Sequence, residues 1–285
     1  MHASGLRPSA IGRGVIGLLL LAALAAAALA APVLAALLGH DAFTPDLFNR
    51  FAPPSAAHPL GTDELGRDLL LRIAYGARVS LAVGLAAALA ATVIGTLVGL
   101  LAAWRGGWVD AALMRLADGL LALPALPLLV ILAAIDPAVV GLPRGEATAD
   151  ILRIAALLAA FGWVGVARLV RATALSVLAR DFVRAARALG VSEARVLARH
   201  VLPSLAAPIA IATALAVGGA ILAESVLSFL GLGIAPPAAS WGNMLANAQE
   251  LVFQAPLAAL WPGLAILLAV LGCNLVADRI TRSGR

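Results

Sequence analysis

The chain has 285 residues, of which 62% are hydrophobic and only 12% are charged. With a mean hydropathy of +1.02, it is too apolar for a water-soluble core, so the composition indicates a polytopic membrane protein. The net charge is +5, but the basic residues lie in short loops between apolar runs, which excludes a nucleic-acid-binding domain.

All twenty basic residues are arginines. A nucleotide-binding P-loop needs a lysine that reaches the phosphates, so the chain is not expected to be an ATPase, and no cofactor is predicted for it. The single cysteine, Cys273, excludes an intrachain disulfide. The four histidines are scattered along the sequence and predict no metal site. They are His2, His40, His58 and His200.

Six apolar runs are long enough, at about 20 residues, to cross a membrane as helices. They cover residues 15–38, 79–103, 113–135, 151–170, 205–230 and 257–277. The expected fold class is an all-α membrane protein with six transmembrane helices. Arg7 and Arg13 precede the first run as in a signal peptide, but the run is longer than a signal peptide requires, so an uncleaved anchor is expected.

The segments between the runs define the expected topology. Residues 1–14 and 278–285 are expected in the cytoplasm, residues 39–78 form an extracytoplasmic loop, and residues 79–277 form a core of five helices. This orientation leaves six of the twenty arginines outside and fourteen inside, in agreement with the positive-inside rule.

The extracytoplasmic loop contains an ordered stretch, HPLGTDELGRDLLLRIAYGAR, that begins at His58. Asp63 is expected to cap a helix from Glu64 to Tyr75 on the membrane surface. The acidic residues lack the alternating ligands of an EF-hand, so calcium is not predicted. The stretch closely resembles the segment before the second span in permeases of the dipeptide, oligopeptide and nickel ABC importer family. The resemblance assigns an extracytoplasmic motif consisting of Gly61, Thr62, Asp63, Gly66, Arg67 and Asp68.

The membrane core contains three candidates for a pore or gate. Pro124 and Pro127 are expected to kink or loosen the third helix, and the carbonyl groups freed there are tolerated against protein or a water-filled path. Glu224, near the outer end of the fifth run, either lines a pore or has a structural role. Gly95 and Gly99 have the small-x-x-x-small spacing of a close helix contact, although membrane helices also tolerate glycine without one.

A polar, arginine-rich segment, DFVRAARALGVSEARVLARHVLP, lies at 181–203 between two apolar runs. Asp181 is expected to cap a helix that ends at Gly190 in a left-handed conformation. Ser192 is expected to cap a second helix that Pro203 cannot continue. The first helix carries an apolar face that can dock in a groove. Its residues are Phe182, Ala185, Ala186 and Leu189.

This segment resembles the coupling loop of membrane subunits of binding-protein-dependent ABC importers. That loop reads Glu-Ala-Ala, three residues, Gly and, after a spacer, a hydrophobic residue, any residue and Leu-Pro. Arg184 replaces the usual Glu, and His200 stands at the hydrophobic position, as in the peptide-importer branch. The resemblance assigns ATPase coupling to Asp181, Arg184, Ala185, Ala186, Gly190, His200, Leu202 and Pro203.

The resemblance runs in order from His58 to Met244 and includes GLGIAPPAASWGNML at 231–245. It implies a type I ABC importer permease of a prokaryotic inner membrane that works by alternating access. The implied partners are a second homologous permease, one or two ATPases that bind ATP and Mg²⁺, an extracytoplasmic binding protein and membrane lipid. Dipeptides, oligopeptides, glutathione and nickel all remain open as substrates. An ion-coupled secondary transporter is the alternative, but the inverted repeats and embedded charges typical of that class are not visible.

Overall fold

The computed structural model describes residues 10–141, 146–246 and 253–283, and their regular structure is helical. The long helices are α1 (Ala10–Leu38), α2 (Leu69–Arg105), α3 (Gly107–Ala122), α5 (Ala147–Leu178), α8 (Leu202–Phe229) and α10 (Pro256–Ser283). The short ones are α4 (Ala125–Ala133), α6 (Asp181–Ala188) and α7 (Glu193–Val196). Single turns of other helix types lie at Leu47–Asn49, Pro137–Val140, Leu197–Val201 and Asn243–Leu245.

Within the described residues, five helices are long and apolar enough to cross a membrane. A sixth span results if α3 and α4, which are bent by 83° at a short break, are counted together. The predicted all-α membrane fold is therefore confirmed. The break lies where the prolines predicted it: α3 ends at Ala122, Leu123 is extended, and Pro124 stands at the N-cap of α4.

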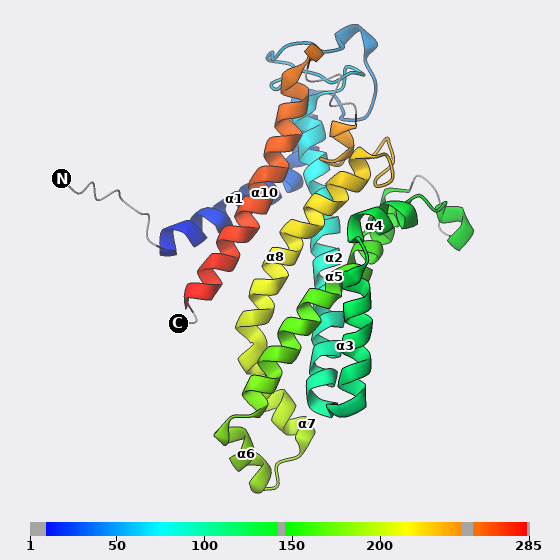
Figure 1. The fold of residues 1–285 in the computed structure, drawn as a ribbon. Coiled ribbons are helices and arrows are strands. Elements are labelled where there is room, and N and C mark those ends of the chain that lie inside the picture. The colour runs from blue at the N-terminus through cyan, green and yellow to red at the C-terminus, as the bar shows by residue number, and fades with distance from the viewer. Residues whose placement is uncertain (1–9, 142–145, 247–252, 284–285) are drawn as a thin grey trace, which may run out of the picture.

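The helices form an elongated bundle with two distinct ends (Figure 1). The 39–68 loop lies at one end, and α6 and α7 lie at the other. We call these the loop end and the coupling end. Helix α2 packs most extensively against α5, α8 contacts α2, and α1 packs against α10 on one flank.

The close approach of α2 to α5 depends on two glycines. A Cβ at Gly95 would lie 2.6 Å from the carbonyl oxygen of Trp163, and one at Gly99 would lie 2.9 Å from Cβ of Val170. Real Cβ atoms do not approach other atoms that closely, so a larger residue would push the helices apart. The structure therefore shows that Gly95 and Gly99 form a close helix contact and are not merely tolerated in the helix.

The start of α2 differs from the prediction. The expected surface helix from Glu64 to Tyr75 with Asp63 as its cap is wrong, because α2 begins at Leu69 and continues without interruption to Arg105. Asp68 is the N-cap, and the N–H of Leu69 still donates to the carbonyl of Gly61 at 3.0 Å. The side chain of Asp63 instead forms ion pairs with Arg67 and Arg72. The extracytoplasmic position of residues 39–78 stays a prediction.

Pro203 also behaves differently from the prediction, because the helical path continues through it. Helix α7 passes through a π-helical turn, Leu197–Val201, into α8, where Pro203 stands in the first turn. A proline ring clashes with the carbonyl one turn earlier in a regular α-helix. The wider π turn places that carbonyl elsewhere, so the helix is not broken.

We expect Gly99→Leu to destabilise the purified chain by about 3 kcal/mol, because the new side chain meets the backbone of α5. The matched control is Gly219→Leu on α8, where no described atom lies within 4 Å of the position of a Cβ. Thermal unfolding in detergent should show a lower melting temperature for Gly99→Leu only. Equal melting temperatures would contradict the packing.

Candidate functional site

The coupling loop, residues 181–203, begins with α6 and turns at Gly190. Gly190 has a φ of +81°. Its N–H donates to the carbonyl of Arg187 at 2.9 Å, and the N–H of Val191 donates to the carbonyl of Ala186 at 3.1 Å. This pair of hydrogen bonds is the Schellman motif that ends a helix, and it requires the left-handed conformation that glycine adopts without strain. The predicted glycine elbow is confirmed.

The two predicted caps are present only in part. Arg180 occupies the N-cap of α6, and Asp181 is the first helical residue, with a side chain that is 98% exposed. Asp181 therefore does not cap the helix, although its charge favours the helix N-terminus. Ser192 does occupy the N-cap of α7, but its hydroxyl makes no capping hydrogen bond within the described chain.

Helix α6 has an inner face that differs from the predicted docking face. Val183 is fully buried and Ala186 is 8% exposed, and Val183 packs in a cluster with Val196 and Leu205. The assignment of Ala186 to the docking face is therefore wrong, because this residue faces the bundle.

The outer face of α6 exposes apolar side chains at the tip of the coupling end. Leu189 is 84% exposed and Phe182 is 45% exposed, and Ala185 is exposed between them. The ring of Phe182 lies 6.0 Å from the ring of His200, which extends this face to the π-helical turn. We call Phe182, Ala185, Leu189 and His200 the tip face. Exposed apolar groups gathered at one place are typical of a binding surface.

Charged side chains surround the tip face. Across the elbow, Nε of Arg187 lies 2.8 Å from Oε1 of Glu193 in an ion pair. On α6 itself, Nη1 of Arg184 lies 3.5 Å from Oδ1 of Asp181. The Arg184 side chain is 70% exposed, so it stands at the rim and not beneath the apolar residues. The remaining assigned residues, Leu202 and Pro203, are exposed at the start of α8.

The coupling loop is firmly joined to the membrane helices. The buried cluster around Val183 includes Val170 and Val177 of α5 and Leu205 of α8. Nearby, Arg171 of α5 forms a two-pronged ion pair with Asp110 near the start of α3. Helix α6 is therefore in direct contact with both α5 and α8 through this cluster.

At the loop end, the 61–68 motif folds into a tight turn in front of α2. Asp63 lies at its centre, with Oδ2 at 2.8 Å from Nε of Arg67 and 3.2 Å from Nε of Arg72. Oδ1 accepts two backbone N–H groups of the turn, both at 2.9 Å. All three charged side chains are buried. Buried charges are tolerated when they are paired and hydrogen-bonded, so this cluster stabilises the turn.

The other residues of the 61–68 motif fix the turn to its surroundings. Thr62 and Asp68 form an isolated antiparallel bridge. Gly66 has a φ of +75°, and a Cβ there would collide with the carbonyl oxygen of Asp46. Asp68 accepts the N–H of Leu71 at 2.8 Å and so starts α2. The motif is thus a structural unit that positions the second span.

Glu224 of α8 belongs to a buried polar network and does not line an open surface. It is fully buried, and it accepts hydrogen bonds from Ser80 Oγ of α2 at 2.9 Å and Ser228 Oγ at 2.7 Å. These hydroxyls in turn accept the backbone N–H groups of Trp241 at 3.2 Å and Ile234 at 3.1 Å. These contacts give Glu224 a structural role, and a pore role for it stays a prediction.

The residues between Pro124 and Pro127, but neither proline, line an apolar concavity of about 350 Å³. It is lined mainly by alanines, glycines and leucines of α2, α4, α5 and α8, among them Ala125, Leu126 and Gly219. Both prolines are exposed. A pore role for the two prolines stays a prediction.

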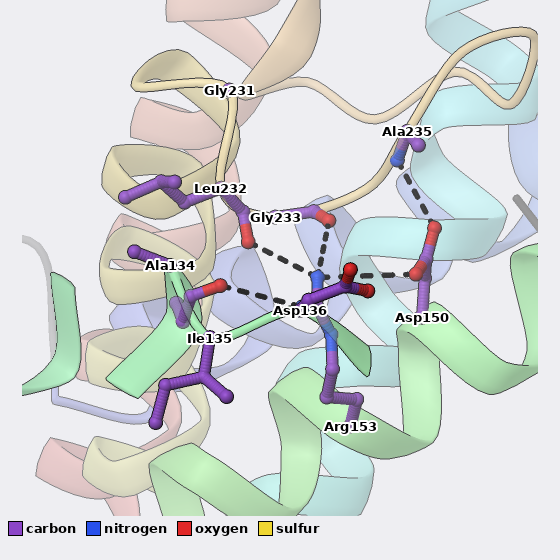
Figure 2. A pocket seen from close by; sticks show the side chains of 10 residues that line it. Ala134, Ile135, Asp136, Asp150, Arg153, Gly231, Leu232, Gly233 and Ala235 are labelled. Carbon is purple, nitrogen blue, oxygen red and sulfur yellow. Dashed lines mark hydrogen bonds and ion pairs between the residues drawn. The ribbon is translucent and has the colours of Figure 1, made fainter. Parts of the chain in front are cut away.

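A second concavity, of about 370 Å³, lies between the end of α4, the start of α5 and the 231–235 segment (Figure 2). Arg153 reaches across it and donates to the carbonyls of Ala133 at 3.3 Å, Leu232 at 3.2 Å and Gly233 at 3.2 Å. Asp150 accepts the N–H of Ala235 at 3.2 Å. These bonds attach the segment after α8 to α5, a role that the sequence alone did not reveal.

The sequence matches, over residues 95–283, the family described as binding-protein-dependent transport system inner membrane component. Three similar proteins are permeases. A dipeptide transport system permease of Alkalihalophilus pseudofirmus is 36% identical over 81% of this chain and 72% of its own length. A putative peptide transport system permease of Brucella suis is 40% identical over 80% of this chain and 73% of its own length. An oligopeptide transport system permease of Bacillus subtilis is 34% identical over 84% of this chain and 75% of its own length.

We expect Glu224→Ala to loosen the segment after α8, because two buried hydroxyl groups lose their acceptor, at a cost of about 2 kcal/mol. Glu224→Gln keeps the shape and an acceptor oxygen and is the matched control. Limited proteolysis of the purified protein should cleave the 231–241 region faster in the alanine variant alone. Identical cleavage of the two variants would show that the network does not hold this segment.

Proposed function

The chain belongs to the family of binding-protein-dependent transport system inner membrane components, and on this premise we propose that it forms, with a second permease, a path for peptides. Membership confirms the predicted resemblance to this family. The substrate class is supported by the relatives, which are named for dipeptide, peptide and oligopeptide transport. Separate ATPases that bind ATP and Mg²⁺ supply the energy, and an extracytoplasmic binding protein delivers the substrate.

The tip face of the coupling loop is the observation that carries this proposal. Its apolar side chains are exposed at the end of the bundle, while the opposite side of α6 is anchored in the buried cluster. A helix held in this way can insert its outer side into a groove of an ATPase. Closure of the ATPases then moves α6, and α5 and α8 follow because they share the cluster around Val183.

The second permease is proposed to cover the apolar concavity beside α8. Small residues line it, and Gly219 is open to contact from outside the chain. Small residues are typical of surfaces where membrane helices approach each other. The path for the substrate forms along this interface, where movement of α8 changes its width.

The proposed orientation places the coupling end and both termini in the cytoplasm. It is supported by the arginine distribution and by the position of α6 at the end opposite to the 39–68 loop (Figure 1). An ATPase is reached only from the side on which ATP is present, so the tip face and the arginine-rich segments must share that side.

Leu189→Glu should uncouple transport, because it places a charge in the tip face, where it would be desolvated on docking. With its partner subunits in proteoliposomes, the variant should lose transport and ATPase retention by at least about tenfold. Gly190→Val should do the same by straining the elbow.

Two variants serve as controls for this test. Arg184→Glu restores the usual residue at an exposed rim position and should keep transport. Ala186→Glu buries a charge inside the loop, so it should reduce the amount of folded protein instead. Normal transport by Leu189→Glu and Gly190→Val would mean that this loop does not couple to an ATPase.

The orientation is tested separately with single cysteines in a Cys273→Ala background. Cysteine at Ser55 in the 39–68 loop should react with an impermeant thiol reagent added outside cells. Cysteine at Ser192 should react only after the membrane is opened. Both positions are exposed, so burial does not account for a difference. The reverse pattern would refute the orientation.

A further inference from the structure

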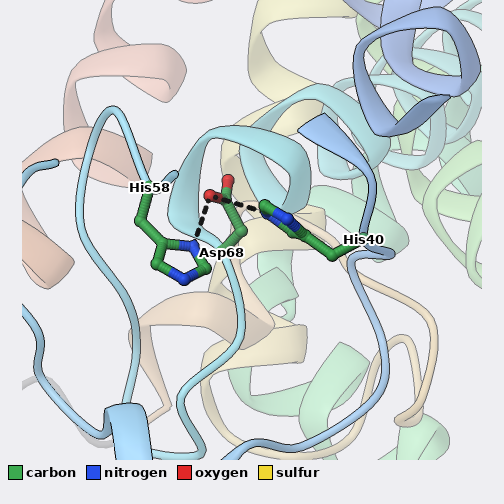
Figure 3. Close-up of side chains that lie close together, drawn as sticks. All are labelled: His40, His58 and Asp68. Atoms are coloured by element: carbon green, nitrogen blue, oxygen red, sulfur yellow. Dashed lines mark hydrogen bonds and ion pairs between the residues drawn. The ribbon is translucent and has the colours of Figure 1, made fainter. Parts of the chain in front are cut away.

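Two histidines that are 18 residues apart in the sequence meet at one carboxylate at the loop end (Figure 3). Nε2 of His40 lies 3.3 Å from Oδ2 of Asp68, and Nδ1 of His58 lies 3.0 Å from the same oxygen. One ligand atom from each of the three side chains lies within 4.8 Å of the others. Their separation in the sequence predicted no such meeting.

We propose that His40, His58 and Asp68 form a binding site for a divalent transition-metal ion of the zinc type. Zinc binds imidazole nitrogen and carboxylate oxygen at about 2.0–2.2 Å, so the ligand atoms of a tetrahedral site lie about 3.3 Å apart. The two distances to Asp68 Oδ2 match this spacing. Two imidazoles favour zinc and its neighbours over calcium or magnesium, which take oxygen ligands.

The three ligands are positioned by separate parts of the backbone. His40 follows Gly39, whose N–H donates to Ala35 at the end of α1. The carbonyl of His58 accepts two backbone N–H groups, from Ser55 at 2.8 Å and Gly61 at 2.9 Å. Asp68 is held through its other oxygen, which caps α2. Ligands that are oriented before the ion arrives bind it more tightly.

The site is open on one side. The side chains of His40 and His58 are 29% and 18% exposed, while that of Asp68 is fully buried. The ion can therefore enter from solvent, and a water molecule can complete the tetrahedron. Asp41, next to His40, is not part of the site, because its oxygens accept hydrogen bonds from Phe43 and Thr44.

The expected effect of the ion is to join the first span to the second. Of the five long spans, the first is the least buried, with 11% of its most apolar window covered by the rest of the chain. A bound ion links the end of α1, through His40, to the first turn of α2, through Asp68. The inferred site is independent of the proposed peptide transport, and it is tested without a transport assay.

The test must separate a metal site from a purely hydrogen-bonded cluster. His40→Gln and His58→Asn place an amide N–H close to the positions of Nε2 and Nδ1, so both keep a donor for Asp68 while removing the imidazole ligand. Asp41→Asn and His200→Ala are matched controls, since they remove a neighbouring carboxylate and a distant imidazole.

The full chain is purified in detergent, stripped with a chelator and titrated with Zn²⁺ by calorimetry. The wild type and both controls should bind one ion per chain, and His40→Gln and His58→Asn should bind it at least about 100-fold more weakly. Co²⁺ added to the wild type should show the intense visible absorption of tetrahedral coordination. Metal binding that is absent, or equal in wild type and the two amide variants, would overturn the proposal and leave a hydrogen-bonded cluster only.

Discussion

The contact between α2 and α5 is the constraint on which the rest of the structure depends. Lipid is as apolar as the surfaces of these helices, so burial alone does not hold them together, and close packing must do so. Gly95 and Gly99 allow the backbone of α5 to approach α2 directly. Helix α8 joins the pair in the same way, because a Cβ at Gly84 would lie 2.5 Å from Ile221.

Polar interactions then fix the two ends of this packed core. At the loop end, Glu224 connects α8 to α2 through Ser80, and Arg153 connects α5 to the segment after α8. At the coupling end, Arg171 joins α5 to α3 through Asp110. In each case an ionisable side chain is hydrogen-bonded to another part of the chain. Such bonds specify which elements are neighbours, a choice that apolar packing alone does not determine.

The features that depend on local chemistry were predictable from the sequence. Apolar length predicted the spans, Pro124 predicted the break before α4, and Gly190 predicted the elbow. Two local expectations nevertheless failed, because Asp181 is not a cap and Pro203 does not end the helical path. The other features that failed depend on three-dimensional neighbours. Asp63 was expected to cap a helix, but its carboxylate forms an ion pair with Arg72, nine residues further along. The meeting of His40 with His58 follows from packing, for which a single sequence carries no periodic signal. Ala186, by contrast, lies three residues after the buried Val183, at the spacing of one helix face.

The length of α5 explains how a docking event at one end can affect the other. Its 32 residues span about 48 Å, more than the thickness of a bilayer. One end shares the buried cluster with α6, and the other carries Arg153, which is bonded to Leu232 and Gly233. A continuous helix packed along its length on α2 moves as a unit. In the proposed mechanism, a displacement of the tip face reaches the segment after α8 without an intervening hinge, and α8, attached at both ends, moves with it.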